Sequence, residues 1–160
     1  MKKYISILIA VFCFSINATA QRYSKEELEN QLQTIVIEKA AYKIDVHQVR
    51  PRRGGIKPIS TYSIEVVNDT LKSAVPYFGR ATSIAYGGGD GLHFKAPIKS
   101  YKTKELSKGR FKVELKADSP DDHYTYILLF YPNGKVNIDV QGINREFISY
   151  QGELIKETSK

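Results

Sequence analysis

The sequence predicts an α+β fold, with one N-terminal helix packed on a curved, meander-type antiparallel β-sheet of about seven or eight strands, as a half-open barrel or a lipocalin-like barrel. Three observations predict it. A capping box opens an amphipathic stretch before residue 40, and apolar and polar residues alternate repeatedly from Tyr42 onward. Near the C-terminus, Pro132-Asn133-Gly134 turns an apolar run back onto an alternating one.

The first twenty residues have the three parts of a secretory signal peptide. Lys2 and Lys3 precede an apolar stretch that ends in Ala18-Thr19-Ala20, a small-residue cleavage site. We expect cleavage after Ala20, a periplasmic or secreted location, and no membrane span afterwards. Residues 21–160 then form a single mature domain, and the loss of two lysines lowers the net charge from +7 to +5. The mature chain has no cysteine, because Cys13 lies in the signal, and the bulky residues around Cys13 disagree with lipidation.

The predicted helix runs from about residue 25 to residue 39. Ser24 and Glu27 form its capping box, in which each side chain reaches a backbone N–H of the first turn. An apolar stripe follows at helical spacing, made of Leu28, Leu32, Ile35 and Val36. We expect this stripe to pack on the sheet, because the polar side is acidic rather than lysine-rich as in membrane-seeking helices.

The predicted sheet covers about residues 42–155. Its first strand runs from Tyr42 to Val49, its second is centred on Ile64, and a third spans about Thr70 to Val75. Three arginines surround Pro51 and two glycines after the first strand. They suit a solvated turn, although they could also grip a phosphate or carboxylate.

Pro76-Tyr77-Phe78-Gly79-Arg80 ends the third strand, since proline cannot donate to a strand ladder. Its aromatic residues beside Gly and Arg suit a folded corner of the core or a stacking surface. Ser83 to Tyr86 is predicted to be extended. The glycine-rich residues 87–91 form a loop, and they do not predict a nucleotide site because a strand, rather than a helix, is expected after them.

Residues 95–116 carry eight Lys or Arg against two Glu. Part of this charge is the wet face of a strand around Val113. The remainder could face an anionic glycan, a lipid surface or an acidic protein of the cell envelope. Nucleic acid is not expected as a partner, because the run lacks the interleaved aromatic residues of a stacking platform.

The acidic residues 118–122 are interpreted as a turn, because they lack the ligand spacing of a calcium loop. From Tyr124 to Tyr131 nearly every residue is apolar, which predicts a central strand covered on both faces. Lys135 to Val140 then alternates, with Asn137 and Asp139 on the wet face. Phe147 to Tyr150 supplies the last predicted strand.

The sequence contains no recognisable catalytic signature. His47, His93 and His123 are far apart along the chain, and the mature chain has no nucleophile motif. We expect no enzyme activity, no cofactor and no metal. A hydrolase with an unrecognised site remains an alternative.

From Ala74 to Ala81 the chain reads Ala-Val-Pro-Tyr-Phe-Gly-Arg-Ala. This string resembles the Leu-Pro-Tyr-Phe-Gly-Arg-Ala signature of domain of unknown function 4251, a family of small exported proteins of Bacteroidota, with Val75 where Leu is commoner. Asn144-Arg145 and the following Phe147 to Gly152 are similar to the closing strand of that family. The resemblance spans roughly residues 27–155. It implies an exported N-terminal helix and an antiparallel β-sheet, and it brings no activity and no catalytic residues.

These features favour an exported binding or interaction module of the cell envelope that acts by non-covalent contact. Its partner is an unidentified envelope protein, an anionic glycan or a lipid surface. The alternative is a carrier of a small apolar ligand in a lipocalin-like cavity. Aromatic and Arg residues are enriched where binding energy concentrates, and on that basis the candidate surface consists of Tyr77, Phe78, Arg80, Tyr86, Asn144 and Arg145.

Overall fold

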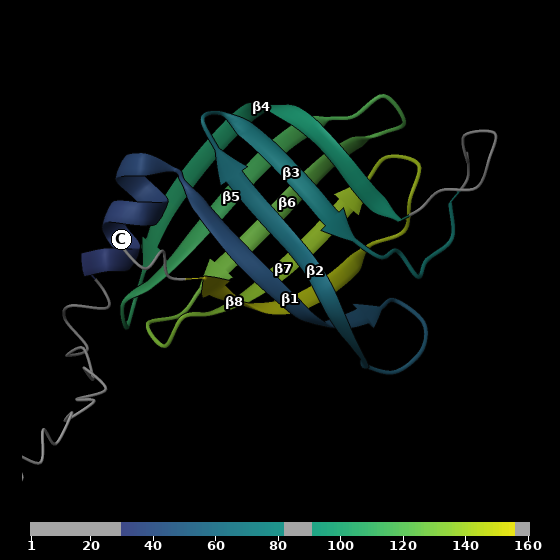
Figure 1. Ribbon diagram of the computed structural model, residues 1–160, viewed down its shortest axis with the longest axis horizontal. Coiled ribbons are helices and arrows are strands. Elements are labelled where there is room, and N and C mark those ends of the chain that lie inside the picture. Colours follow the sequence, from purple (N-terminus) through teal and green to yellow (C-terminus); the bar gives the residue numbers. More distant parts are fainter. Residues whose placement is uncertain (1–29, 82–90, 156–160) are drawn as a thin grey trace, which may run out of the picture.

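The structure is a computed structural model that describes residues 30–81 and 91–155. These residues form a closed antiparallel barrel in which each strand pairs with its sequence neighbours and the last pairs with the first (Figure 1). The strands are β1 (Tyr42–Pro51), β2 (Lys57–Val67), β3 (Thr70–Val75), β4 (Leu92–Leu106), β5 (Arg110–Asp118), β6 (His123–Phe130), β7 (Lys135–Gly142) and β8 (Ile148–Ile155). The predicted meander of seven or eight strands is thus a closed barrel of eight.

The turns form where the sequence supplies residues that tolerate positive φ. Asn68 and Asp69 both have positive φ between β2 and β3, as a two-residue hairpin turn requires. Between β6 and β7, Gly134 has a φ of 83° and its N–H donates to the carbonyl of Tyr131. The Asn133 side chain accepts from the N–H of Lys135, so the predicted Pro-Asn-Gly hairpin is present.

The core is the inside of the barrel, because alternate side chains of each strand point inward. In β6 the burial alternates, and Tyr124, Tyr126, Leu128 and Phe130 are buried while Ile127 and Leu129 are only partly covered. The prediction that this strand is covered on both faces is therefore wrong. A strand of a single-layer barrel has one inner face, and the apolar residues on its outer face remain accessible.

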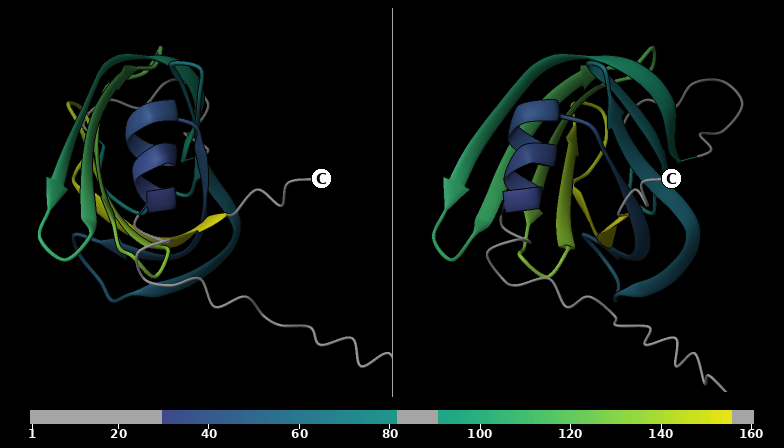
Figure 2. Two further views of the ribbon diagram at one scale, coloured as in Figure 1. Left: turned by 90° about the vertical axis from the view of Figure 1, so that its left-hand side faces the viewer. Right: turned by 60° about the vertical axis from the view of Figure 1, so that its left-hand side comes forward.

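A short helix closes one end of the barrel. Residues 30–33 are α-helical and continue into the π-helix η1 (Thr34–Lys39), which lies across the ring of strands (Figure 2). Leu32 and Val36 of the predicted apolar stripe are buried, and the Tyr101 hydroxyl donates to the Val36 carbonyl at 2.8 Å. Leu28 and the predicted capping box lie outside the described residues.

The described chain is mostly β, so the α+β class is not confirmed. One short helix contributes Leu32 and Val36 to a core otherwise built from strand residues. The helix therefore covers an end of the barrel and does not form a layer over a sheet face, because the sheet has already buried its inner face by closing on itself.

The meander places the loops at two opposite ends. The connections β1–β2, β5–β6 and β7–β8, together with residues 76–81 after β3, lie at one end, on the right in Figure 1. The other end carries η1 and the remaining turns. The basic residues 95–116 form most of the β4–β5 hairpin, in which Lys104 and Lys112 face each other across the strands.

Candidate functional site

The two segments that carry the predicted site residues lie side by side at the end opposite η1. An isolated bridge joins Ala81 to Arg145, and the N–H of Glu146 donates to the Arg80 carbonyl at 3.0 Å. The Tyr77 hydroxyl lies 2.9 Å from both the Arg80 and the Glu146 carbonyl oxygens. Since a hydroxyl has one proton, it donates to one of these at a time.

Two contacts between cationic side chains and aromatic rings lie beside these hydrogen bonds. The Arg145 guanidinium lies 5.2 Å from the centre of the Tyr77 ring, and the Lys57 ammonium lies 4.9 Å from the centre of the Phe78 ring. A Cβ on Gly79 would collide with the Tyr77 hydroxyl, so the Gly between Phe78 and Arg80 makes room for the ring. Burial raises the pKa of Tyr77, which keeps the hydroxyl protonated and able to donate.

Asn144 belongs to a neighbouring cluster around the buried carboxylate of Asp122. This carboxylate accepts hydrogen bonds from the backbone N–H groups of His123 at 2.8 Å, Ile143 at 3.1 Å and Asn144 at 3.1 Å. It therefore joins the β5–β6 loop to the β7–β8 loop. A Cβ on Gly142 would lie 2.5 Å from the same carboxylate, which explains the glycine there.

The structure thus brings Tyr77, Arg80 and Arg145 into one cluster, with Asn144 beside it, while Tyr86 lies outside the described residues. Most of their contacts join loops of this chain to one another. Phe78 is the predicted site residue whose ring is exposed. As a binding surface the set stays a prediction, and its hydrogen bonds indicate a structural role in closing this end of the barrel.

The inside of the barrel is filled by side chains. At mid-height Ile44, Val113, Leu128 and Ile138 have no exposed surface, and Tyr126 is fully buried with its hydroxyl 3.0 Å from Ser73 Oγ. Side chains that line an internal cavity large enough for water keep some accessible surface. The described core residues leave no ligand-sized cavity beside them.

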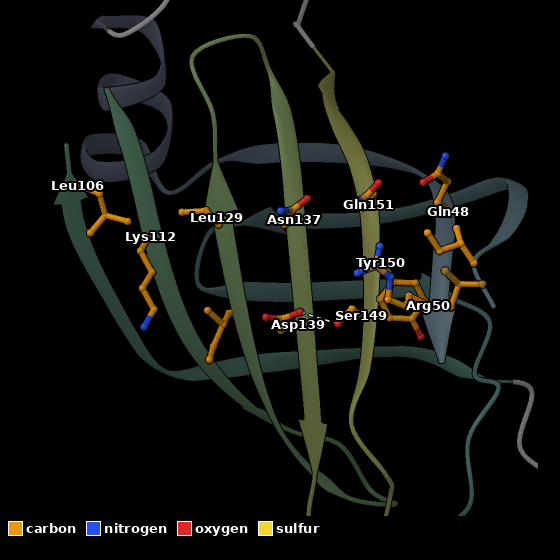
Figure 3. A pocket seen from close by; sticks show the side chains of 13 residues that line it. Gln48, Arg50, Leu106, Lys112, Leu129, Asn137, Asp139, Ser149, Tyr150 and Gln151 are labelled. Carbon is orange, nitrogen blue, oxygen red and sulfur yellow. Dashed lines mark hydrogen bonds between the residues drawn. The ribbon is translucent and has the colours of Figure 1, made fainter. Parts of the chain in front are cut away.

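A concave site lies instead on the outer face of β5, β6, β7, β8 and β1 (Figure 3). This outer pocket has a volume of about 300 Å³ and is lined by Gln48, Val49, Arg50, Ile56, Leu106, Lys112, Ile127, Leu129, Asn137, Asp139, Ser149, Tyr150 and Gln151. Measured along the curved sheet, the four spacings between these five strands, about 4.8 Å each, add to about 19 Å.

The strand register arranges the lining in two parallel rows. The first row runs from Lys112 to Leu129, Asn137, Gln151 and Gln48, each directly opposite the next on the neighbouring strand. The second row runs from Ile127 to Asp139, Ser149 and Arg50. Each row is apolar on β6 and polar on β7, β8 and β1.

The polar half holds three carboxamides in succession, those of Asn137, Gln151 and Gln48. The Asn137 amide nitrogen donates to the Tyr131 hydroxyl at 3.1 Å, and the Ser149 hydroxyl donates to Asp139 at 2.7 Å. Lys112 and Arg50 lie on opposite sides of the pocket (Figure 3). A second depression adjoins it, sharing the three carboxamides and adding His47, Tyr131, Asn133, Lys135, Val136, Gly152 and Glu153.

Sequence reasoning missed this pocket. The alternation of β7 placed Asn137 and Asp139 on the wet face, but Gln48 and Gln151 lie 103 residues apart along the chain. Only the pairing of β1 with β8, which closes the barrel, places them together.

The histidines do not gather at one site. His47 is on β1, His93 is on β4 with its ring against Tyr62, and His123 on β6 lies 2.8 Å from Asp118. Within residues 30–81 and 91–155, no three His, Cys, Asp or Glu side chains are placed to hold a metal ion. The described part of the chain also has no helix with the length and apolar character needed to cross a membrane.

Comparison with known proteins settles the family. The family described as domain of unknown function (DUF4251) matches residues 23–154. This chain belongs to the DUF4251 family. The resemblance inferred from the Pro-Tyr-Phe-Gly-Arg string is thereby confirmed. The fold is similar to the crystal structure of a DUF4251 family protein from Bacteroides eggerthii DSM 20697, with a TM-score of 0.61 and 13% identity over 80% of this chain and 87% of that one. No curated protein matches.

Proposed function

We propose that this DUF4251 protein is an exported, non-catalytic binding module of the cell envelope, periplasmic or secreted, and that its outer pocket binds an acidic glycan. The observation that carries the proposal is the row of three carboxamides on the outside of the barrel, in a pocket that also holds Lys112 on β5 and Arg50 on β1.

The carboxamides suit the hydroxyl groups of a sugar chain. A sugar hydroxyl both donates and accepts, and each Asn or Gln side chain offers two N–H donors and one carbonyl acceptor. Asn137, Gln151 and Gln48 stand one strand spacing apart. A pyranose ring is about as wide as that spacing, so successive sugars of an extended glycan can each meet one amide.

The cations favour an anionic glycan over a neutral one. Arg50 and Lys112 lie at opposite sides of the pocket, and the guanidinium of Arg50 can pair with a carboxylate through two parallel hydrogen bonds. The one carboxylate in the described lining, Asp139, already accepts the Ser149 hydroxyl. This hydroxyl does not neutralise the carboxylate, and Arg50 and Lys112 together leave the described lining with a net charge of +1.

The apolar half suits the carbon-rich face of a sugar ring. Ile127 and Leu129 are half-buried on the outer side of β6, and Leu106 extends the apolar surface beyond β5. A sugar bound across β6 and β7 would cover these side chains while its hydroxyls reach the amides. This arrangement also accounts for an apolar outer face on one strand of a barrel whose other outer faces are largely polar.

Packing supports this surface over the carrier alternative. A carrier needs an internal cavity, and the described inner side chains are buried against one another. An envelope protein that docks on the same pocket is the remaining alternative, and the ligand test separates it from a glycan.

Calorimetric titration of the mature chain with an oligogalacturonate tests the proposal, and its neutral methyl ester is the matched ligand. Arg50→Ala should weaken binding of the acid by about 10- to 100-fold, the loss expected for a charged hydrogen bond, and should leave the ester unaffected. Gln151→Ala should weaken both ligands.

Two control variants have no role in the pocket. Lys99→Ala removes an exposed cation from β4, and Gln31→Ala removes an exposed carboxamide from the helix. Both should bind as the parent does. The proposal would be contradicted if Arg50→Ala and Gln151→Ala bind the ligands as tightly as the parent does. It would also be contradicted if the two control variants lose as much affinity as these variants.

A further inference from the structure

Large exposed apolar side chains gather at the end of the barrel opposite η1. Within the described residues, such side chains are Ile56, Phe78, Ile143, Phe147 and Ile155. Four of the five lie on loops at this end, and Ile155 lies at the other end of β8. Three of these four, Ile56, Phe78 and Phe147, lie on segments that strand pairing and a contact between a cation and an aromatic ring bring together.

The contacts of these segments define one continuous rim. Phe147 directly precedes Ile148, which pairs with Pro51 at the end of β1, so it lies beside the β1–β2 loop. That loop ends at Lys57, whose ammonium lies 4.9 Å from the centre of the Phe78 ring. The basic rim, as we name it, consists of Arg52, Arg53, Ile56, Lys57, Phe78 and Phe147.

The basic rim carries three cations and no carboxylate. Arg52, Arg53 and Lys57 are all exposed. A nearby acid, Glu146, has an oxygen 3.4 Å from the N–H of Arg80. On the β5–β6 side of this end, the Asp122 carboxylate accepts backbone N–H groups and Asp118 pairs with His123, while Asp121 is exposed. The positive charge and the exposed phenylalanines therefore coincide on one sector.

We propose that the basic rim docks the protein on the surface of a bilayer that contains anionic lipids. Lys and Arg near such a surface are attracted by its negative potential, and aromatic and aliphatic side chains insert at the boundary between headgroups and acyl chains. Loop tips at one end of a barrel can meet a flat surface together. The basic rim and the outer pocket share Ile56, while the other lining residues of the pocket lie on the strands at the side of the barrel. Vesicle binding is therefore tested with variants other than those used for glycan binding.

Cosedimentation of the mature chain with lipid vesicles tests the proposal. The vesicles are made of phosphatidylcholine alone or of about three parts phosphatidylcholine to one part phosphatidylglycerol, which gives a negative surface. The protein should bind the anionic vesicles and lose binding as salt is raised. The Arg52→Ala/Arg53→Ala variant should bind about 30-fold more weakly, and Phe78→Ala/Phe147→Ala at least about tenfold more weakly.

Matched controls remove the same chemistry from the opposite end. Ile155→Ala deletes an exposed apolar side chain, and Lys102→Ala/Lys104→Ala deletes two exposed cations of the β4–β5 hairpin. These variants should bind as the parent does. If Phe78→Ala/Phe147→Ala is destabilised, the Arg52→Ala/Arg53→Ala variant alone tests the proposal, because its substitutions lie in an exposed turn.

Three results would overturn the proposal. One is equal binding to neutral and anionic vesicles, and another is a loss of binding as large in the controls as in the rim variants. The third is sedimentation equilibrium that finds a dimer abolished by Phe78→Ala/Phe147→Ala, since the rim would then be an interface between copies of this chain.

Discussion

Replacing Asp122 by alanine tests how the end of the barrel opposite η1 is held together. The carboxylate is 4% exposed and accepts hydrogen bonds from the backbone N–H groups of His123, Ile143 and Asn144. Alanine removes the acceptor for all three, and the β5–β6 and β7–β8 loops lose the side chain that joins them.

The magnitude follows from the number and kind of bonds. A hydrogen bond to a charged group contributes about 1.5 to 3 kcal/mol, and relaxation of the loops toward water recovers part of the loss. We expect Asp122→Ala to lower the free energy of unfolding by about 4 kcal/mol, which is large beside a typical domain stability of about 5 to 15 kcal/mol. Asp122→Asn keeps one acceptor oxygen and should cost about 1 to 2 kcal/mol.

Urea unfolding of the mature chain, followed by circular dichroism, measures these changes, with the slope m checked for constancy. Asp121→Ala is the matched control, because it removes the neighbouring exposed carboxylate and should change stability by less than about 0.5 kcal/mol. An Asp122→Ala variant within about 1 kcal/mol of the parent would show that the three N–H groups find other partners, and the reasoning would be wrong.

Three further predictions concern the hydroxyls and the core. Tyr77→Phe removes the hydroxyl shared by two carbonyl oxygens and should destabilise the chain by about 1 kcal/mol in urea unfolding; an unchanged midpoint would refute the structural role of this residue. Leu128→Ala creates a cavity in the middle of the barrel and should cost about 3 kcal/mol by the same assay, whereas a cost below about 1 kcal/mol would contradict a tightly packed core. Burial raises the pKa values of Tyr101 and Tyr124 to about 12, above the value of about 10 in an unfolded chain, so the fold favours the protonated form. Their contribution to stability should be complete below about pH 10 and lost as the pH rises from about 10 to about 12; unfolding free energies that stay flat across this range would disprove it.

Most strands could be predicted because they carry a local signal, although of β4 only residues 92–95 were expected to be a strand. Thr70–Val75 and Lys135–Gly142 begin where the alternation begins, and the turns at Asn68-Asp69 and Asn133-Gly134 lie where residues tolerate positive φ. The alternation of apolar and polar residues gave no guide on β6, since a run that is apolar at nearly every position does not say which face is inside. The π-helical form of η1 and its place at the barrel end were not predictable either, because they depend on contacts such as that between Tyr101 and Val36.

For the predicted site, too, some features could be predicted from the sequence and others depend on the tertiary structure. The Tyr77 and Arg145 segments were combined in one predicted surface and do lie side by side, but only the tertiary structure reveals that their polar groups are largely engaged within the chain. The row of Asn137, Gln151 and Gln48 carried no signal in the sequence, because three amides on separate strands become a row only through strand register.

By itself, then, the sequence determined the family, the order and approximate number of the strands and the positions of most turns, because these depend on neighbours within a few residues. The closure of the sheet, the filling of its interior and the grouping of side chains into the outer pocket and the basic rim were decided by tertiary structure. The physical reason is that the β1–β8 pairing joins residues about a hundred positions apart, and no local pattern encodes that contact.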